Sequence, residues 1–288
     1  MKIAIGTAQF GLKYGICNQS GRVSAKEVRQ ILDLASSRGV DTIDTAIGYG
    51  ESESTLGKVG INGWKVVSKL PEIPPGCLDV KSWIYDQITN SLNRLNVKSL
   101  DTFMLHRPSQ LLDEIGPLIY QTLQQLKLDG LTKKIGVSIY TPEELPEIFE
   151  NRHFDIVQAP FSLLDRRLLL SGWMKKLKSL GVELHVRSIF LQGLLLISPK
   201  NRMSKFALWD PVWNEWDKWL KSNQITPLEA CIRYALSIGE IDKIVVGVDS
   251  LDQLSDILKV NSDKLGQLPE WPLNIDHKLM TPSLWGSI

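Results

Sequence analysis

Two kinds of hydrophobic pattern alternate along this chain. Short runs rich in valine and isoleucine are typical of strands buried on both faces, and longer stretches with apolar residues three and four positions apart are typical of amphipathic helices. The short runs predict strands at residues 2–5, 40–43, 65–68, 102–105, 134–137, 156–158, 183–186 and 243–246. The longer stretches predict helices at residues 24–39, 52–59, 80–95, 113–128, 142–151, 166–180, 227–237 and 251–260.

The helix predicted at residues 24–39 has a clear start signal. Ser24 is a good N-cap residue, and Glu27 stands three positions later, which is the spacing of a capping box. Val28, Ile31 and Leu32 then give the helix one apolar face. Such a helix is expected to pack that face against a sheet.

Strand followed by helix, repeated eight times, predicts a (β/α)8 barrel, or TIM barrel, of the α/β class. The alternative is an open doubly wound sheet, which usually carries a GxGxxG turn after its first strand, but the chain reads IGTAQFG there. No linker interrupts the pattern, so we expect residues 1–288 to form a single domain. Within it, residues 188–210 are expected to form a loop on the active-site face, and residues 261–288 a tail over the barrel mouth.

The overall composition is that of an ordinary globular protein. Of the 288 residues, 43% are hydrophobic and 23% are charged, and 33 basic residues nearly balance 32 acidic ones, for a net charge of +1. This balance gives no field that would attract nucleic acid or an anionic membrane. We therefore expect a small-molecule partner, no nucleic acid, no membrane, and a monomer or small homo-oligomer.

The cysteines and most histidines indicate neither disulfides nor a metal site. The cysteines are odd in number and far apart, which fits a reducing compartment; they are Cys17, Cys77 and Cys231. Three histidines lack metal-ligand spacing and are interpreted as structural or solvated: His153, His185 and His277.

The chain begins with a strand pattern rather than a signal peptide, and no apolar run approaches the ~20 residues that span a bilayer. We expect a cytoplasmic protein without a metal.

Reactive side chains stand at the ends of three successive predicted strands, where barrels of this kind carry their chemistry. The second strand runs into Asp44, with Tyr49 in the loop that follows. The third strand runs into Lys69, and the fourth into His106. Singly, each residue has an ordinary explanation, such as a turn cap for the aspartate. Together, they are predicted to meet in one site.

A carboxylate, a phenol, an ammonium and an imidazole can together reduce a carbonyl group. A free tyrosine, with a pKa near ~10, is a poor acid at neutral pH. The ammonium of Lys69 is expected to lower the pKa of Tyr49, while Asp44 keeps that ammonium charged. Tyr49 could then donate a proton to a carbonyl oxygen as hydride reaches the carbon, with a neutral His106 orienting the oxygen.

The segments IDTAIGYGESE, VVSKL and LDTFMLHRP resemble the aldo-keto reductase family. The resemblance continues through GTAQFG, KIGVS, IVQAPFS, SIFLQGLL and IVVGVDSLDQL. It implies a (β/α)8 barrel that uses NAD(P)H to reduce an aldehyde or ketone. It places the catalytic tetrad of the family on Asp44, Tyr49, Lys69 and His106, with Tyr49 as the proton donor.

The same resemblance implies a nicotinamide cofactor and the residues that bind it. Ser138 and Gln158 would hydrogen-bond the carboxamide, and Asp44 would lie near the ribose. Backbone N–H groups of Gly247 and Val248, at the start of a helix, are expected to hold a phosphate. The implied cofactor site is completed by Arg187, Asp249, Gln253 and Asp256.

Three positions depart from the family pattern. Ile139 stands where an asparagine is usual, and Arg187 stands where an aromatic residue usually stacks on the nicotinamide. A guanidinium can lie flat on a ring, and it can equally bind a phosphate or an anionic substrate, so these roles stay open. After Gly247 the run VDSLDQL holds no basic residue for a 2′-phosphate, while Asp249 can accept hydrogen bonds from ribose hydroxyls. This favours NAD over NADP without deciding between them.

Two other functions fit the same residues. A barrel that binds the cofactor without turnover would be a redox-sensing regulatory subunit. An aldolase-like barrel would instead use Lys69 to form a Schiff base with its substrate.

Two features bear on the substrate. A cavity mouth lined by Arg187 would suit an anionic substrate such as a phosphorylated or nucleotide-linked sugar. Aromatic faces suit sugars and hydrophobic carbonyls alike, and the tryptophans that could form a pocket wall or belong to the core are Trp209, Trp213, Trp271 and Trp285.

Overall fold

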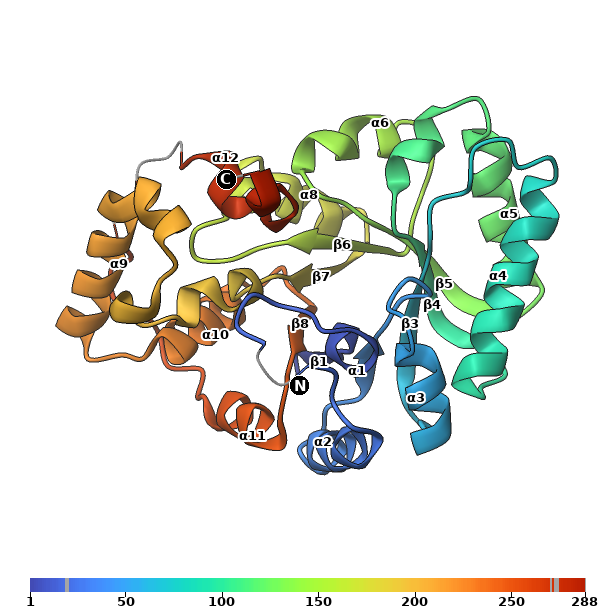
Figure 1. Ribbon diagram of the computed structural model, residues 1–288. Helices are drawn as coiled ribbons and strands as arrows, with labels where there is room; N and C mark the ends of the chain where they lie inside the picture. Colours follow the sequence, from blue (N-terminus) through green and yellow to red (C-terminus); the bar gives the residue numbers. More distant parts are fainter. Residues whose placement is uncertain (19–20, 270, 272–274, 288) are drawn as a thin grey trace.

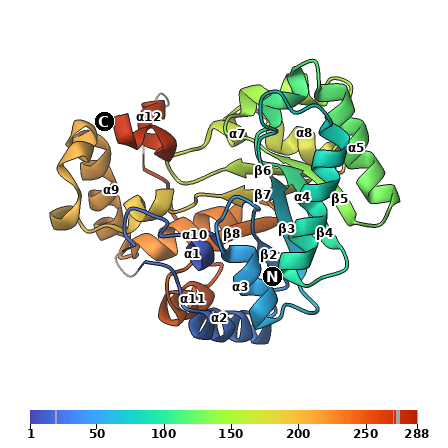
Figure 2. The same cartoon turned by 45° about the vertical axis from the view of Figure 1, so that its right-hand side comes forward.

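The structure is a computed structural model that describes residues 1–18, 21–269, 271 and 275–287. Over these residues the strands form one closed barrel, in which neighbours are parallel and the order follows the sequence (Figures 1 and 2). The last strand pairs with the first, for example at Ile244 and Ile3, and closes the sheet. The barrel is confirmed and the open sheet is excluded. The strands are β1 Ile3–Gly6, β2 Thr42–Asp44, β3 Lys65–Leu70, β4 Leu100–Leu105, β5 Thr132–Ser138, β6 Ile156–Pro160, β7 Glu183–Arg187 and β8 Lys243–Gly247.

Helices surround the barrel, as Figure 1 shows. The predictions for α4 and α10 agree with the structure at both ends. The helix predicted at 166–180 is two helices, because Gly172 between them adopts a φ of 78°. The helices of the barrel are α1 Ala8–Gly11, α2 Ala25–Ser37, α3 Ser52–Val59, α4 Val80–Leu95, α5 Gly116–Leu128, α6 Leu145–Phe149, α7 Arg167–Leu170, α8 Trp173–Ser179, α10 Pro227–Ser237 and α11 Leu251–Lys259.

Capping at the start of α2 connects two helices. The hydroxyl of Ser24 accepts a hydrogen bond from the Glu27 N–H, which confirms the N-cap but forms only half of the predicted capping box. The carboxylate of Glu27 accepts a bond at 3.4 Å from the N–H of Leu251, the first residue of α11. The two helices beside the junction of β1 and β8 are thereby joined.

A lobe outside the barrel holds a helix that was not expected. Residues 188–210, expected as a loop, contain short 3₁₀ helices at Leu191–Leu196, Pro199–Asn201 and Ser204–Trp209. They lead into α9, Asp210–Asn223, which stands apart from the barrel near the tail helix α12, His277–Met280 (Figures 1 and 2). Tryptophan contacts hold this lobe together.

The aromatic packing in the lobe explains most of its tryptophans. The rings of Trp216 and Trp219 stack at 5.7 Å, and Trp216 also meets Trp271 at 5.9 Å between ring centroids. In the tail, Trp285 packs edge-on against Phe206 at 5.0 Å. The four tryptophans considered as pocket walls are all buried and none lines the cavity described below: Trp209, Trp213, Trp271 and Trp285.

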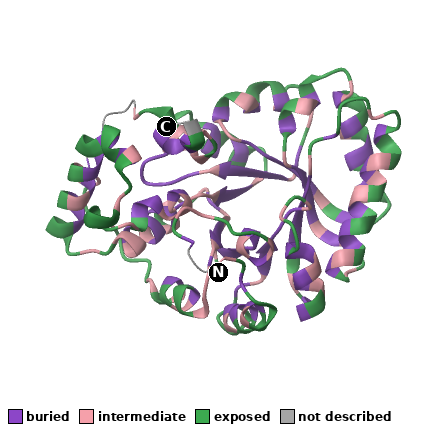
Figure 3. Cartoon of the chain, in the orientation of Figure 1, coloured by how far each residue is buried: buried purple, intermediate pink, exposed green. Residues whose placement is uncertain are grey.

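Inside the barrel, a layer of apolar side chains lies beneath polar side chains at the carboxyl ends of the strands. Val67, Met104 and Ile156 form a small buried cluster separate from the main core, which lies between strands and helices (Figure 3). Because side chains on one face of a strand recur every second residue, the next positions on that face of β3 and β6 are Lys69 and Gln158. Strand alternation therefore stacks polar side chains on an apolar base, at the carboxyl ends of the strands.

Some classes of site receive no support from the described residues. Within them, no helix combines the length and apolar character needed to cross a bilayer. No three histidine, cysteine, aspartate or glutamate side chains in the described ranges are grouped so that they could hold a metal ion. The three cysteines are free.

Candidate active site

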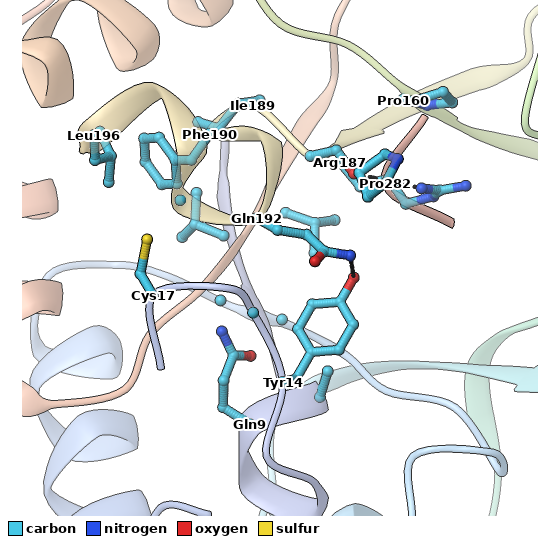
Figure 4. Close-up of a pocket in the computed structure, with 18 of the residues that line it drawn as sticks. Gln9, Tyr14, Cys17, Pro160, Arg187, Ile189, Phe190, Gln192, Leu196 and Pro282 are labelled. Atoms are coloured by element: carbon cyan, nitrogen blue, oxygen red, sulfur yellow. Dashed lines mark hydrogen bonds between the residues drawn. The ribbon is translucent and has the colours of Figure 1, made fainter. Parts of the chain in front are cut away.

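A cavity of about 640 Å³ opens at the carboxyl ends of the strands (Figure 4). Three of the four predicted catalytic side chains line it, namely Asp44, Tyr49 and His106. The tail contributes residues 280–283 to the same wall. A volume of this size suits a small-molecule site, for which about 300–1,000 Å³ is typical.

Lys69 does not line the cavity but lies beneath it, bound to Asp44. Its Nζ is 2.6 Å from Oδ1 of Asp44 and donates a second bond to the carbonyl oxygen of Thr45 at 2.8 Å. The lysine is 0% exposed and Asp44 is 3% exposed. An ammonium so far from water requires such partners. The register of β2 with β3, which pairs Asp44 with Val67, places Lys69 two residues further, beside the strand end.

Tyr49 lies between the buried ammonium and the imidazole. The Nζ of Lys69 is 5.2 Å from the centroid of the Tyr49 ring. The ring of His106 meets the Tyr49 ring edge-on, with 5.8 Å between centroids and 77° between planes. The structure thus brings the four predicted catalytic side chains together.

Burial dominates the protonation states in this site. Loss of water, followed by the charge of Asp44, raises the pKa of Tyr49 above its usual range. The expected fall in the pKa of Tyr49 is therefore not seen in the protein alone, because loss of water is the largest influence on this phenol and raises its pKa. Burial also lowers the pKa of Lys69. At neutral pH, Tyr49 is a protonated phenol.

Burial likewise sets the charge of His106. It lowers the pKa of His106 to about 3, and the positive charges of Lys69 and Arg187 act in the same direction. The imidazole is therefore neutral at physiological pH. A neutral imidazole has one N–H donor and one acceptor.

The side chains of the two residues expected to bind a carboxamide form hydrogen bonds to other protein groups instead. The hydroxyl of Ser138 donates to Oε1 of Gln158 at 3.3 Å, and Nε2 of Gln158 donates to Oδ2 of Asp44 at 2.7 Å. Both residues are buried, and neither lines the cavity. Gln158 instead hydrogen-bonds Asp44, so that one carboxylate oxygen of Asp44 accepts from Lys69 and the other accepts from Gln158.

The end of β8 contributes a polar wall, which we call the β8 side of the cavity. It is formed by Gly247, Asp249, Gln253 and Asp256. Val248, predicted to take part, is buried and does not line the cavity. Helix α11 begins at Leu251 with Ser250 as its N-cap, so Gly247 ends a strand and does not open a helix as expected.

Asp249 is held on the β8 side by a residue from the opposite end of the chain. Its Oδ1 accepts a bond from Nδ2 of Asn18 at 2.9 Å, and its backbone N–H donates to Oε1 of Gln253 at 2.8 Å. Burial raises the pKa of this half-buried carboxyl. The described residues give its Oδ2 no hydrogen-bond partner.

The sequence did not indicate the part played by the loop after β1. Gln9 of helix α1 and three residues of the loop after it line the cavity, namely Tyr14, Cys17 and Asn18. Tyr14 meets Gln192 across the opening, with 3.3 Å between the phenol oxygen and Nε2 (Figure 4). These partners are 178 positions apart. No local pattern marks such a contact; only the GTAQFG motif marks where the loop begins.

Arg187 lines the cavity close to the catalytic group. Its Nη2 donates to the carbonyl oxygen of Ile139 at 3.1 Å, and its Cζ lies 5.0 Å from the centroid of the Tyr140 ring. Figure 4 shows it at the same end of the cavity as Pro160 and Pro282, with Cys17 at the other end. Tyr140 also lines the cavity and was not predicted.

Comparison with known proteins decides the family. The sequence model of the Aldo/keto reductase family matches residues 2–268. The chain belongs to the aldo/keto reductase family. In an alignment of 307 positions, this aldo/keto reductase is 25% identical to oxidoreductase sirO of Leptosphaeria maculans. The alignment covers 94% of this chain and 89% of that protein.

Solved structures share the barrel of this aldo/keto reductase. Aldo-keto reductase AKR11C1 from Bacillus halodurans, in its holo form, matches with a TM-score of 0.71 and 20% identity, over 92% of this chain and 88% of that one. Glycerol dehydrogenase AKR11B4 from Gluconobacter oxydans matches with a TM-score of 0.70 and 21% identity, with the same coverage of 92% and 88%. At these identities the likeness shows the fold alone. Family membership supports an NAD(P)-dependent oxidoreductase that acts on small carbonyl compounds.

The donor groups of the cavity fit such a cofactor in part. On the β8 side, the half-buried carboxylate of Asp249 suits ribose hydroxyls, and the glycines Gly6 and Gly247 add no side chain to the wall. A Cβ on Gly247 would lie 2.4 Å from the Gln9 amide, so this approach is already tight. Ser138 and Gln158 do not face the cavity, and they would have to exchange their mutual bond for one to a carboxamide.

Proposed function

We propose that this protein reduces an aldehyde or ketone with NAD(P)H, and that Tyr49 donates the proton. The observation that carries the proposal is the position of Tyr49 on the cavity wall, between a neutral His106 and the buried pair of Lys69 and Asp44. A protonated phenol and a neutral imidazole beside one cavity can both donate a hydrogen bond to a carbonyl oxygen.

Each side chain then has a separate role. A bound reduced nicotinamide would supply the hydride. The phenol of Tyr49 would hydrogen-bond the carbonyl oxygen and transfer its proton as negative charge develops there. The N–H of His106 would hold the same oxygen. Lys69, whose Nζ lies 5.2 Å from the centroid of the phenol ring, would stabilise the phenolate that remains, and Asp44 would keep that ammonium charged despite its burial.

We favour NAD over NADP for this site. The polar wall on the β8 side carries Asp249, Gln253 and Asp256 and no lysine or arginine from that loop. A carboxylate accepts hydrogen bonds from ribose hydroxyls and repels a 2′-phosphate.

The surroundings of Lys69 argue against the aldolase-like alternative. A Schiff-base lysine must reach its substrate as a free amine. Here the Nζ is fully buried, bound to Asp44 and Thr45, and absent from the cavity wall. Protection of Lys69 from borohydride trapping with keto substrates would agree with this.

Replacing Tyr49 by phenylalanine tests the proposal most directly. We expect Tyr49→Phe to lower the rate of carbonyl reduction by about 100-fold or more, because general acid catalysis typically contributes ~10²–10⁴. The dissociation constant for NADH should change by less than about twofold, because only the proton donor is removed. Steady-state oxidation of NADH and NADPH with a panel of aldehydes and ketones measures the first, and quenching of tryptophan fluorescence measures the second.

Tyr14→Phe is the matched control, because it removes another phenol oxygen from the same cavity. It should lose less than about tenfold, since Tyr14 is no part of the proposed proton transfer. A Tyr49→Phe variant that keeps most of its rate would show that Tyr49 is not the acid. A wild-type protein that binds cofactor but reduces no carbonyl would favour the regulatory alternative.

A further inference from the structure

We infer that the carbonyl substrate carries an anionic group, a carboxylate or phosphate, and that Arg187 binds it. This inference rests on the proposed function and specifies the substrate class for the same cavity. Its basis is a guanidinium on the cavity wall without an acidic partner, near the groups that would act on the carbonyl.

Arg187 has unused hydrogen-bonding capacity. Its contacts within the described residues are the Ile139 carbonyl oxygen at 3.1 Å and the Ser188 hydroxyl at 3.4 Å. Among these residues no aspartate or glutamate oxygen lies within 4.0 Å of its nitrogens. A guanidinium has five N–H donors, of which these contacts use two. Its charge is therefore available to a ligand.

Of the other charged side chains that line the cavity, Arg167 and Asp44 have partners of opposite charge, and Asp249 and Asp256 belong to the β8 side. Arg167 also lines the cavity, but its Nε and Nη2 bind the two oxygens of Asp165 at 2.8 and 2.7 Å. Asp44 is paired with Lys69. Arg187 is thus an uncompensated cation on this wall.

The guanidinium is also held in place before any ligand arrives. The carbonyl oxygen of Ile139 fixes one edge, and the ring of Tyr140 lies 5.0 Å from its Cζ. A cation fixed in this way loses less conformational entropy when it binds an anion. Its planar fork matches a carboxylate or a phosphate through paired hydrogen bonds.

Arg187 lies near enough to the catalytic group to bind the same molecule. Its positive charge contributes to lowering the pKa of His106 and of Lys69, and it opposes the rise in the pKa of Tyr49. Arg187 and Tyr49 also line the same cavity, so an anion bound to Arg187 would belong to a substrate whose carbonyl reaches Tyr49.

Matched substrate pairs test the inference. We compare 4-oxobutanoate with its methyl ester, and glyceraldehyde 3-phosphate with glyceraldehyde, as ratios of kcat/KM for the charged over the neutral member. In the wild type, at least one ratio should exceed unity by about tenfold or more. Arg187→Met should lower that ratio by about 10- to 100-fold, the usual effect of losing charged hydrogen bonds. The pair that responds distinguishes a carboxylate from a phosphate.

Two further variants serve as controls. Arg187→Lys keeps the positive charge but lacks the paired N–H donors of the planar guanidinium. Its ratio of kcat/KM for the charged over the neutral substrate should therefore lie between those of Arg187→Met and the wild type. Arg107 lies 4.9 Å from the same Tyr140 ring, but it is exposed and does not line the cavity. Arg107→Met should therefore leave the ratio within about twofold of the wild type. Melting temperatures confirm that each variant is folded.

Two results would overturn the inference. One is a wild-type ratio near unity for both pairs. The other is an equal loss for the charged and neutral members in Arg187→Met, with weaker binding of NADH, which would assign Arg187 to the cofactor.

Calorimetric titration with 4-hydroxybutanoate and with glycerol 3-phosphate separates failure of the inference from failure of the proposed function. If the protein reduces no carbonyl but binds one of these anions through Arg187, the proposed function fails and the anion site stands. If it reduces neutral carbonyls and binds neither anion, only the anion site fails.

Discussion

At Tyr49, burial and charge act on one hydroxyl in different directions. Removal from water and the carboxylate of Asp44 raise its pKa, while the cation at Arg187 lowers it. The net result is a phenol that keeps its proton well into the alkaline range. For a group that must give up a proton only in the transition state, this keeps the acid form populated.

A pH profile follows from these residues. Tyr49 has a raised pKa, so it stays protonated, and His106, with its pKa near 3, stays neutral as pH rises above that value. With saturating NADH and carbonyl, we expect kcat for reduction to vary by less than about threefold between about pH 5 and pH 9. Steady-state assays in overlapping buffers measure this. An inflexion near pH 6.5 would mean that His106 titrates like an exposed histidine and would contradict the assignment.

At the scale of elements, the short helix α1 supports the turn that carries Tyr49. A Cβ on Gly11, the last residue of α1, would lie 1.8 Å from the carbonyl oxygen of Tyr49 and 2.4 Å from the N–H nitrogen of Ser52. The final glycine of the GTAQFG motif therefore allows two backbones to touch. The motif that contributed to the family resemblance has a direct structural reason.

Gly11→Ala tests this contact. We expect a loss of stability of about 1–3 kcal/mol, the usual cost of overpacking, and a lower kcat, because the turn carrying Tyr49 must move. Thermal unfolding and steady-state kinetics measure the two effects. Gly48→Ala is the control from the same turn, since a Cβ there meets nothing within 4 Å. Equal behaviour of the two variants would show that the close approach is unimportant.

Elements differ in how far the sequence predicted them. Helices α4 and α10 agree with prediction at both ends, because Asp79 caps one and the capping box of Thr226 and Glu229 opens the other. Helix α9 was missed because three of the five buried residues on its apolar face are tryptophans, which suit a pocket as well as a core. Its partners in the tail lie far along the chain, so only the folded molecule shows what covers that face.

At the scale of the whole molecule, the cavity is completed at the junction of the first and last strands. Asn18 follows β1 and Asp249 follows β8, and their side chains meet at 2.9 Å. The alternation of strand and helix predicted that these strands pair, and the strand ends at which the tetrad stands predicted that its side chains meet at one end of the barrel. It could not predict which side chains of the two loops touch, because loop conformation follows no period.

The charge on the β8 side should determine the choice of cofactor. We expect Asp249→Arg to strengthen binding of NADPH relative to NADH by about tenfold or more, because a repelling carboxylate becomes an attracting cation. Quenching of tryptophan fluorescence by each cofactor measures the ratio of dissociation constants.

Asp252→Arg makes the same charge change at an exposed position of α11 that does not line the cavity. It should leave that ratio within about twofold. An unchanged ratio in Asp249→Arg would place the 2′-phosphate site elsewhere.

The bond between Asn18 and Asp249 spans 231 positions of the chain. A ribosome must therefore release most of the polypeptide before this part of the cavity exists. Until β8 has emerged, Asn18 has no Asp249 carboxylate to bind. This part of the cavity would be among the last features that the nascent protein acquires.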